Sequence, residues 1–100
     1  MLNIRTDING EAITIAMEGI LDSQTTPDLE KVLEENYANV SEINFDFKDL
    51  EYLTSAGLRA ILVAKQEMIK KGGELTVRNV PRDVMAIFNE TGFAALFNIK

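Results

Sequence analysis

The sequence predicts an α/β fold: a single domain with a mixed sheet of four to five strands and helices mainly on one face. Short segments of alternating apolar and polar residues, typical of strands with one buried face, interchange with amphipathic helical segments in the order β-β-α-β-α-β-α-(β). The 100 residues, of which 46% are hydrophobic and 26% charged, fit one folded domain with a sizeable core. We therefore expect one domain over residues 1–100.

The first two strands are predicted to form a hairpin. Residues 2–8 are a short, weakly patterned strand, and residues 9–10, Asn-Gly, are a strong hairpin turn signal. Large apolar residues alternate with smaller ones over residues 12–17. Gly19 is expected to end this strand, and residues 20–24 are expected to form a loop.

The first helix is predicted to begin at a clear start signal. Thr26 is the expected N-cap, Pro27 the first helical residue, and Asp28 an acidic residue that suits the first turn. The apolar stripe of this helix continues to about residue 38. The clearest strand follows at residues 42–47, where apolar and polar residues alternate strictly.

A long amphipathic helix is predicted from Leu58 to about Lys71, where Gly72 and Gly73 form a typical C-terminal stop. Its C-terminal half carries three lysines, which suit the negative end of its dipole: Lys65, Lys70 and Lys71.

The last part of the chain is predicted to add a strand, a helix and an end segment. Residues 75–78 form a short strand. Pro81 begins a third helix, which Gly92 ends. Residues 96–99 are either a final edge strand or a short packed tail.

Composition excludes several classes of function. The chain has ten basic and sixteen acidic residues, which gives a formal net charge of −6. This charge argues against a nucleic-acid partner, because such binding needs a basic surface. The chain has no Cys and no His, so it lacks thiol chemistry and the commonest general base and metal ligand. We expect no cofactor and no metal. No apolar run is long enough for a membrane helix, and no signal sequence is visible, so we expect a cytoplasmic protein without membrane insertion.

The stretch before the second helix is the candidate site. Thr54 and Ser55 are adjacent hydroxyls, followed by the small residues Ala56 and Gly57, at a predicted helix start. Ser55 has two interpretations: a helix N-cap, or a phosphorylation site where the positive end of a helix dipole would tolerate a phosphate. Arg59, four residues on, has the helical spacing to reach that phosphate.

Residues spread over the whole chain resemble the STAS domain family, and within it the small bacterial anti-sigma factor antagonists. The segment Leu53-Thr-Ser-Ala-Gly-Leu58 follows an Ile-Asn-Phe-Asp-Phe strand, as in that family. The other matching segments, in chain order, are residues 18–22, 72–77, 79–84, 90–93 and 96–97.

The resemblance implies a non-enzymatic switch. In such antagonists the unphosphorylated domain binds an anti-sigma factor that is also a serine kinase, which frees a sigma factor for transcription. Phosphorylation of a serine at the start of the second helix dissociates the complex, and a serine phosphatase resets it. By position that serine is Ser55, and Asp22 is the acidic loop residue close to it. The implied partner surface comprises Asp22 and residues 54–59: Thr54, Ser55, Ala56, Gly57, Leu58 and Arg59.

Two positions depart from the family pattern and keep alternatives open. Thr54 stands where well-known members have Asp, and Ala56 stands where Ser or Thr is frequent. Thr54 is then a second candidate phosphate acceptor. The alternative function is a STAS scaffold subunit that is not phosphorylated, in a lipid-transport or stress-signalling assembly. A hydrolase using Ser55 as nucleophile lacks a visible base.

Overall fold

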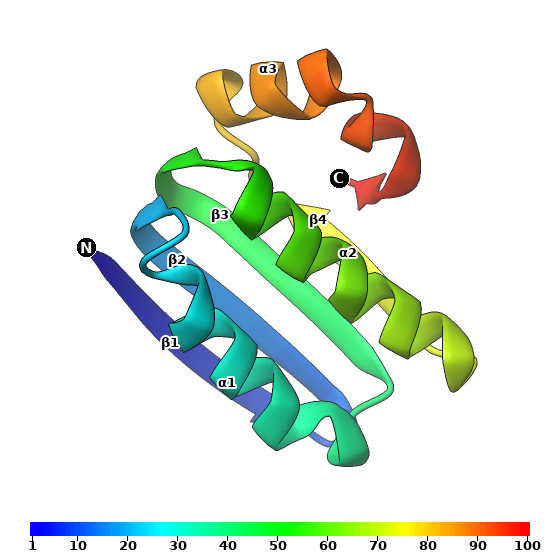
Figure 1. Ribbon diagram of the computed structural model, residues 1–100. Coiled ribbons are helices and arrows are strands. Elements are labelled where there is room, and N and C mark those ends of the chain that lie inside the picture. The colour runs from blue at the N-terminus through cyan, green and yellow to red at the C-terminus, as the bar shows by residue number, and fades with distance from the viewer.

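A five-stranded mixed sheet, with the strands in the order β1-β2-β3-β4-β5, is the frame of the computed structural model, which describes residues 1–100 (Figure 1). β1 pairs antiparallel with β2, and the remaining neighbours are parallel. The predicted mixed sheet and order of elements are confirmed. The elements are β1 (Leu2–Asn9), β2 (Ala12–Leu21), α1 (Thr26–Asn36), β3 (Glu42–Leu53), α2 (Ser55–Lys70), β4 (Glu74–Arg78), α3 (Arg82–Thr91) and β5 (Asn98–Ile99), with 3₁₀ turns at Tyr37–Asn39 and Phe93–Leu96.

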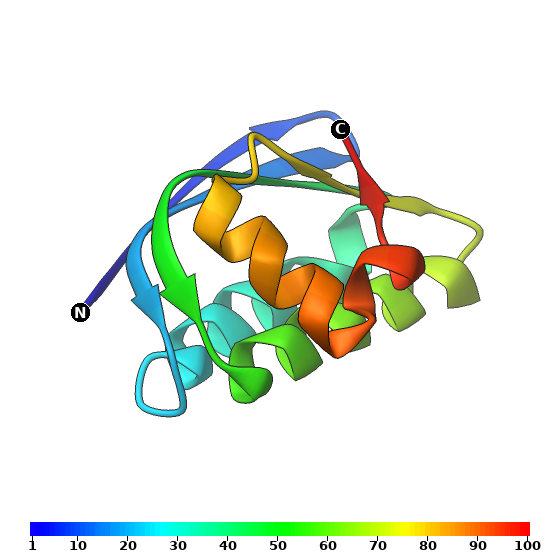
Figure 2. The same ribbon diagram turned by 90° about the horizontal axis from the view of Figure 1, so that it is seen from above.

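The three helices cover one face of the sheet, as Figure 2 shows from above. The inward side chains of the central strands, such as Ile15 on β2 and Phe45 on β3, are fully buried beneath them. Burying a side chain of this size stabilises the fold by about 1.5–3 kcal/mol. Phe88 of α3 extends this core, with its ring 6.1 Å from that of Phe47. The prediction of helices on one face is confirmed.

The hairpin is confirmed, but its turn and its second strand differ from the prediction. The turn residues are Gly10 and Glu11, since Asn9 still pairs with Ala12. β2 does not end at Gly19 but continues to Leu21. Gly19 has φ +111°, and a Cβ there would lie 2.2 Å from the carbonyl oxygen of Met1, so only glycine lets the first residue pass this close.

β3 is twice as long as predicted, because two bulges hide its alternation. Ala16 pairs with Asp46 but Glu18 pairs with Asp49, so β3 holds one extra residue there, and the register shifts again farther on. The buried positions after residue 46 are therefore three apart, at Phe47, Leu50 and Leu53. The strict alternation of apolar and polar residues stops at Phe47, so the prediction that the strand ends there is wrong.

The helix boundaries are shifted by a few residues. The N-cap position of α1 is Thr25 instead of Thr26. α2 begins three residues earlier than predicted, at Ser55. α3 ends at Gly92, which has the left-handed φ of +80° expected of a helix stop. Residues 96–99 divide between a 3₁₀ turn and the two-residue strand β5. No helix has the length and apolar character needed to cross a membrane.

Candidate functional site

The parallel pairing of β2 and β3 brings the candidate residues together. Leu21 and Leu53 are register partners at the ends of the two strands, and the Thr54 amide donates to the Leu21 carbonyl at 3.0 Å. The loop that begins at Asp22 and the helix that begins at Ser55 therefore leave the same edge of the sheet side by side (Figure 2). In open α/β sheets, ligands bind outside the carboxyl ends of the strands, and the candidate residues lie at these ends.

The start of α2 is a set of open backbone donors. The first helical hydrogen bond is donated by the Leu58 amide to the Thr54 carbonyl, at 3.0 Å. The amides of Ser55, Ala56 and Gly57 have no intrahelical acceptor and no other hydrogen bond. They form the positive end of a helix of 16 residues. This end of α2 can accept an anion without rearrangement of the backbone.

The two adjacent hydroxyls have opposite environments. Ser55 is the first helical residue and its side chain is exposed. Thr54 is the N-cap residue with extended backbone, but its side chain makes no capping bond, and its Oγ1 is buried without a hydrogen-bond partner. The interpretation of Ser55 as the N-cap is therefore wrong by one residue. Only the Ser55 hydroxyl is accessible to an enzyme that would modify it.

Asp22 organises the neighbouring loop. Its Oδ1 accepts hydrogen bonds from the amides of Gln24, at 2.9 Å, and Thr25, at 3.0 Å. The Thr25 hydroxyl closes the turn by donating to the carbonyl of Ile20 at 2.9 Å. The Thr25 amide is the main cause that holds the pKa of Asp22 below its ordinary value, with partial burial opposing it. Asp22 therefore presents an ionised carboxylate beside the start of α2.

Two of the predicted partner-binding residues lie inside the domain. Leu58 is 1% exposed, and Gly57 is buried. A Cβ at Gly57 would come within 2.7 Å of the Leu21 side chain and 3.2 Å of its carbonyl oxygen. Gly57 thus lets the end of β2 approach α2 closely. These residues hold the site in place and offer no side-chain surface to a partner.

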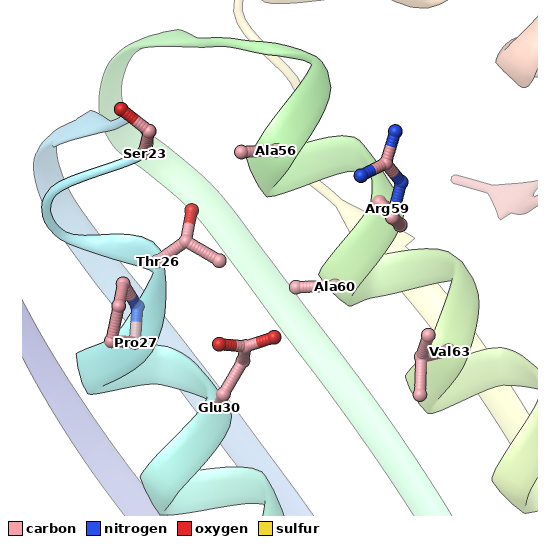
Figure 3. Close-up of a pocket in the computed structure, with 8 residues that line it drawn as sticks. All are labelled: Ser23, Thr26, Pro27, Glu30, Ala56, Arg59, Ala60 and Val63. Atoms are coloured by element: carbon pink, nitrogen blue, oxygen red, sulfur yellow. The ribbon is translucent and has the colours of Figure 1, made fainter.

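A cavity of about 240 Å³, with Ala56 in its wall, lies between the loop, α1 and α2. Figure 3 shows its walls, with Ala56, Arg59, Ala60 and Val63 on one side and Ser23, Thr26, Pro27 and Glu30 on the other.

Four cavity residues carried no sequence signal of their own: Ser23, Glu30, Ala60 and Val63. The spacing of Val63 four residues after Arg59 nevertheless places both on one side of α2. Arg59 is exposed and takes part in neither of the two ion pairs in the structure. Its guanidinium is free to meet an incoming anion.

Comparison with known proteins gives this arrangement a family. Residues 4–98 match the family model described as Mlab, STAS domain. The anti-sigma-B factor antagonist of Bacillus subtilis (strain 168) is 28% identical over 102 residues, which cover 99% of this chain and 93% of that protein.

Solved structures show the same fold at low identity. An anti-sigma factor antagonist from Mycobacterium paratuberculosis aligns with a TM-score of 0.86 at 19% identity, over 99% of this chain and 85% of its own. The anti-sigma factor antagonist SpoIIAA aligns in its unphosphorylated form with a TM-score of 0.81 at 16% identity, over 98% and 87% of the two chains. Its phosphorylated form aligns with a TM-score of 0.79 at 17% identity, over 98% of this chain and 91% of its own. The chain belongs to the STAS domain family.

Proposed function

We propose that this protein is a phosphorylation-controlled anti-sigma factor antagonist. The unphosphorylated domain binds an anti-sigma factor that is also a serine kinase, and so releases a sigma factor. The kinase phosphorylates Ser55 and the complex dissociates, and a serine phosphatase restores the binding form. The names of the B. subtilis relative and of SpoIIAA, which has been solved in both phosphorylation states, support this class of function.

The observation that carries the proposal is the contrast between the two hydroxyls. Ser55 is exposed at the first position of α2, beside three unpartnered amides, whereas the Thr54 hydroxyl is buried. A phosphate on Ser55 adds about −1.5 to −2 charges at a helix N-terminus, where the open amides stabilise it. The fold of the domain therefore tolerates the modification.

The same phosphate changes the surface that a partner meets. The Asp22 carboxylate lies in the loop that leaves the sheet beside α2, so phosphorylation of Ser55 adds a second anionic group to this end of the molecule. A partner that buries this surface must then desolvate both groups, which weakens binding. The proposed contact surface is Asp22, Ser55, Ala56 and Arg59, with the neighbouring cavity, and Thr54, Gly57 and Leu58 support it from within.

Phosphorylation itself can be tested with the serine kinase encoded nearest to this protein's gene. The protein is incubated with active kinase and ATP, and the modified residue is mapped by mass spectrometry. We expect one phosphate on Ser55, none on Ser55→Ala, and unchanged modification of Thr54→Val. A kinase that is active on itself but leaves Ser55 unmodified contradicts the switch.

A second candidate is a STAS subunit that binds its partner without phosphorylation, in a lipid-transport or stress-signalling assembly. Two observations favour it: the matching family model is described as that of Mlab, and the position before Ser55 is a buried Thr hydroxyl instead of a carboxylate. Ser55→Asp discriminates the two functions by calorimetric titration with the partner. A switch loses at least about tenfold in affinity, because like charges meet at the contact, and a passive subunit does not respond.

A further inference from the structure

β1 is a long and regular strand at the edge of the sheet. It runs for eight residues, Leu2–Asn9, and its register with β2 contains no bulge. It carries no Pro, and Arg5 and Asp7 are its charged residues. The opposite edge, β5, has only two residues. β1 is therefore the place where this sheet can gain another strand.

The hairpin geometry decides which backbone groups of β1 point outward. Asn9 and Ala12 close a two-residue turn, and in such a hairpin the closing pair is hydrogen-bonded. Hydrogen-bonded and non-hydrogen-bonded pairs then alternate along the strand. The residues whose amides and carbonyls point away from β2 are therefore Leu2, Ile4, Thr6 and Ile8.

The side chains of β1 match a second copy of β1 in one register. If two strands run antiparallel with Thr6 opposite Thr6, then Arg5 lies opposite Asp7 of the other copy, twice by symmetry. An antiparallel pairing centred on Arg5 or on Asp7 instead places like charges opposite each other. The charges that deter a foreign strand thus favour a copy of the same chain, in this register.

The exposed apolar surface of β1 fits the same register. Ile8 is 56% exposed, whereas Ile4 is half-buried and packs against the core on the helix-covered face. The Thr6-centred pairing lays Ile4 of one copy against Ile8 of the other. Arg5 is free to take part, because its ion pair with Asp49 is long, at 3.9 Å, and its side chain is 75% exposed.

We propose that two copies of this chain associate through antiparallel β1 strands centred on Thr6, so that the two sheets become one. This association goes beyond the proposed switch and uses an edge of the sheet separate from α2 (Figure 1). Its ligand is a second copy of the protein itself.

A charge-swap cycle tests the proposal on the full chain by sedimentation equilibrium, from about 5 to about 500 µM, the range of weak association. Asp7→Arg and Arg5→Asp each place like charges opposite one another and should raise the dimer dissociation constant about tenfold or more. The double variant Arg5→Asp/Asp7→Arg restores opposite charges and should return to within about threefold of the original value.

Glu90→Arg is the matched control, because this exposed residue of α3 changes the formal net charge from −6 to −4, as Asp7→Arg does. It should leave the dissociation constant unchanged. A wild-type monomer at every concentration overturns the proposal. The proposal is also overturned if the double variant dimerises as weakly as the single variants, or if Glu90→Arg raises the dissociation constant as much as Asp7→Arg does.

Thr6→Pro provides a second test that does not depend on charge. It removes an outward amide, and proline is tolerated where a strand's N–H points away from its sheet. We expect a monomer with the far-ultraviolet circular dichroism of the wild type. A Thr6→Pro variant that dimerises like the wild type contradicts the proposal, and the charge cycle decides the matter if this variant does not fold.

Discussion

Thr54 and Ser55 are neighbours in the chain, yet only one of their hydroxyls reaches solvent. The Thr54 Oγ1 atom is buried without a partner, so replacing the hydroxyl by a methyl group removes an unsatisfied polar atom. We predict that Thr54→Val leaves the free energy of unfolding unchanged or raises it by up to about 1 kcal/mol, measured by urea denaturation.

Thr25→Val is the matched control for this substitution. The Thr25 hydroxyl donates to the carbonyl of Ile20 and accepts from the amide of Asp22, both at 2.9 Å. Its loss should lower the free energy of unfolding by about 1–3 kcal/mol, because it leaves two part-buried groups unpaired. If Thr54→Val is as destabilising as Thr25→Val, the Thr54 hydroxyl has a bonding role in the folded protein.

Asp22 makes the stability of the loop depend on pH. Its pKa lies below the ordinary value of 3.8, chiefly because the Thr25 amide donates to it. A carboxylate with a lowered folded pKa contributes stability above its unfolded pKa, and this contribution is lost as the pH falls through the folded pKa. We predict that the wild type melts higher than Asp22→Asn at neutral pH, and that the difference shrinks as the pH falls below 3.8 and through the folded pKa. A difference in melting temperature that is independent of pH would contradict this role.

At the level of single elements, Gly57 sets how closely α2 approaches the end of β2. Helix propensity alone favours Ala over Gly by about 1 kcal/mol. The added Cβ, however, would lie 2.7 Å from the fully buried Leu21 side chain and 3.2 Å from its carbonyl oxygen. We predict that Gly57→Ala lowers the free energy of unfolding by about 1–3 kcal/mol, measured by urea denaturation. If Gly57→Ala is instead more stable than the wild type, the Leu21 side chain moves aside without loss of packing energy.

The strands show which features local patterns predict and which they do not. Regular alternation at Ile13 and Ile15, and again at Ile43 and Phe45, predicts the central strands and their buried face correctly. The second half of β3 is missed, because bulges against β2 depend on the partner strand and replace period two by period three. The site motif was visible in the sequence, but the burial of the Thr54 hydroxyl depends on the packing of the folded chain.

At the scale of the whole molecule, Lys65 of α2 and Lys71, which directly follows α2, contact segments outside this helix. Lys71 was predicted to suit the dipole of α2, but its Nζ donates to the carbonyls of Tyr37 and Val40, which follow α1. Lys65 lies with its Nζ 5.7 Å from the ring centre of Phe97, near the other end of the chain. Such contacts join segments more than thirty residues apart, so no local pattern can predict them. They keep α1, α2 and the C-terminal segment together under the sheet.

The electrostatic field between α1 and α2 is expected to act on Tyr37. Partial burial, followed by the nearby carboxylates of Glu67, Glu34 and Glu30, raises the pKa of Tyr37 to about 12. The unfolded tyrosine ionises at about 10, so the unfolded state releases its proton first and the protein loses stability as the pH rises from about 10 to about 12. We predict that Glu67→Gln lowers the pKa of Tyr37. The phenolate absorbance reports it in a Tyr52→Phe background, where Tyr37 is the single remaining tyrosine. Glu90→Gln, on α3, should leave the titration unchanged, and an equal shift in both variants would assign the effect to net charge instead of to the field between the two helices.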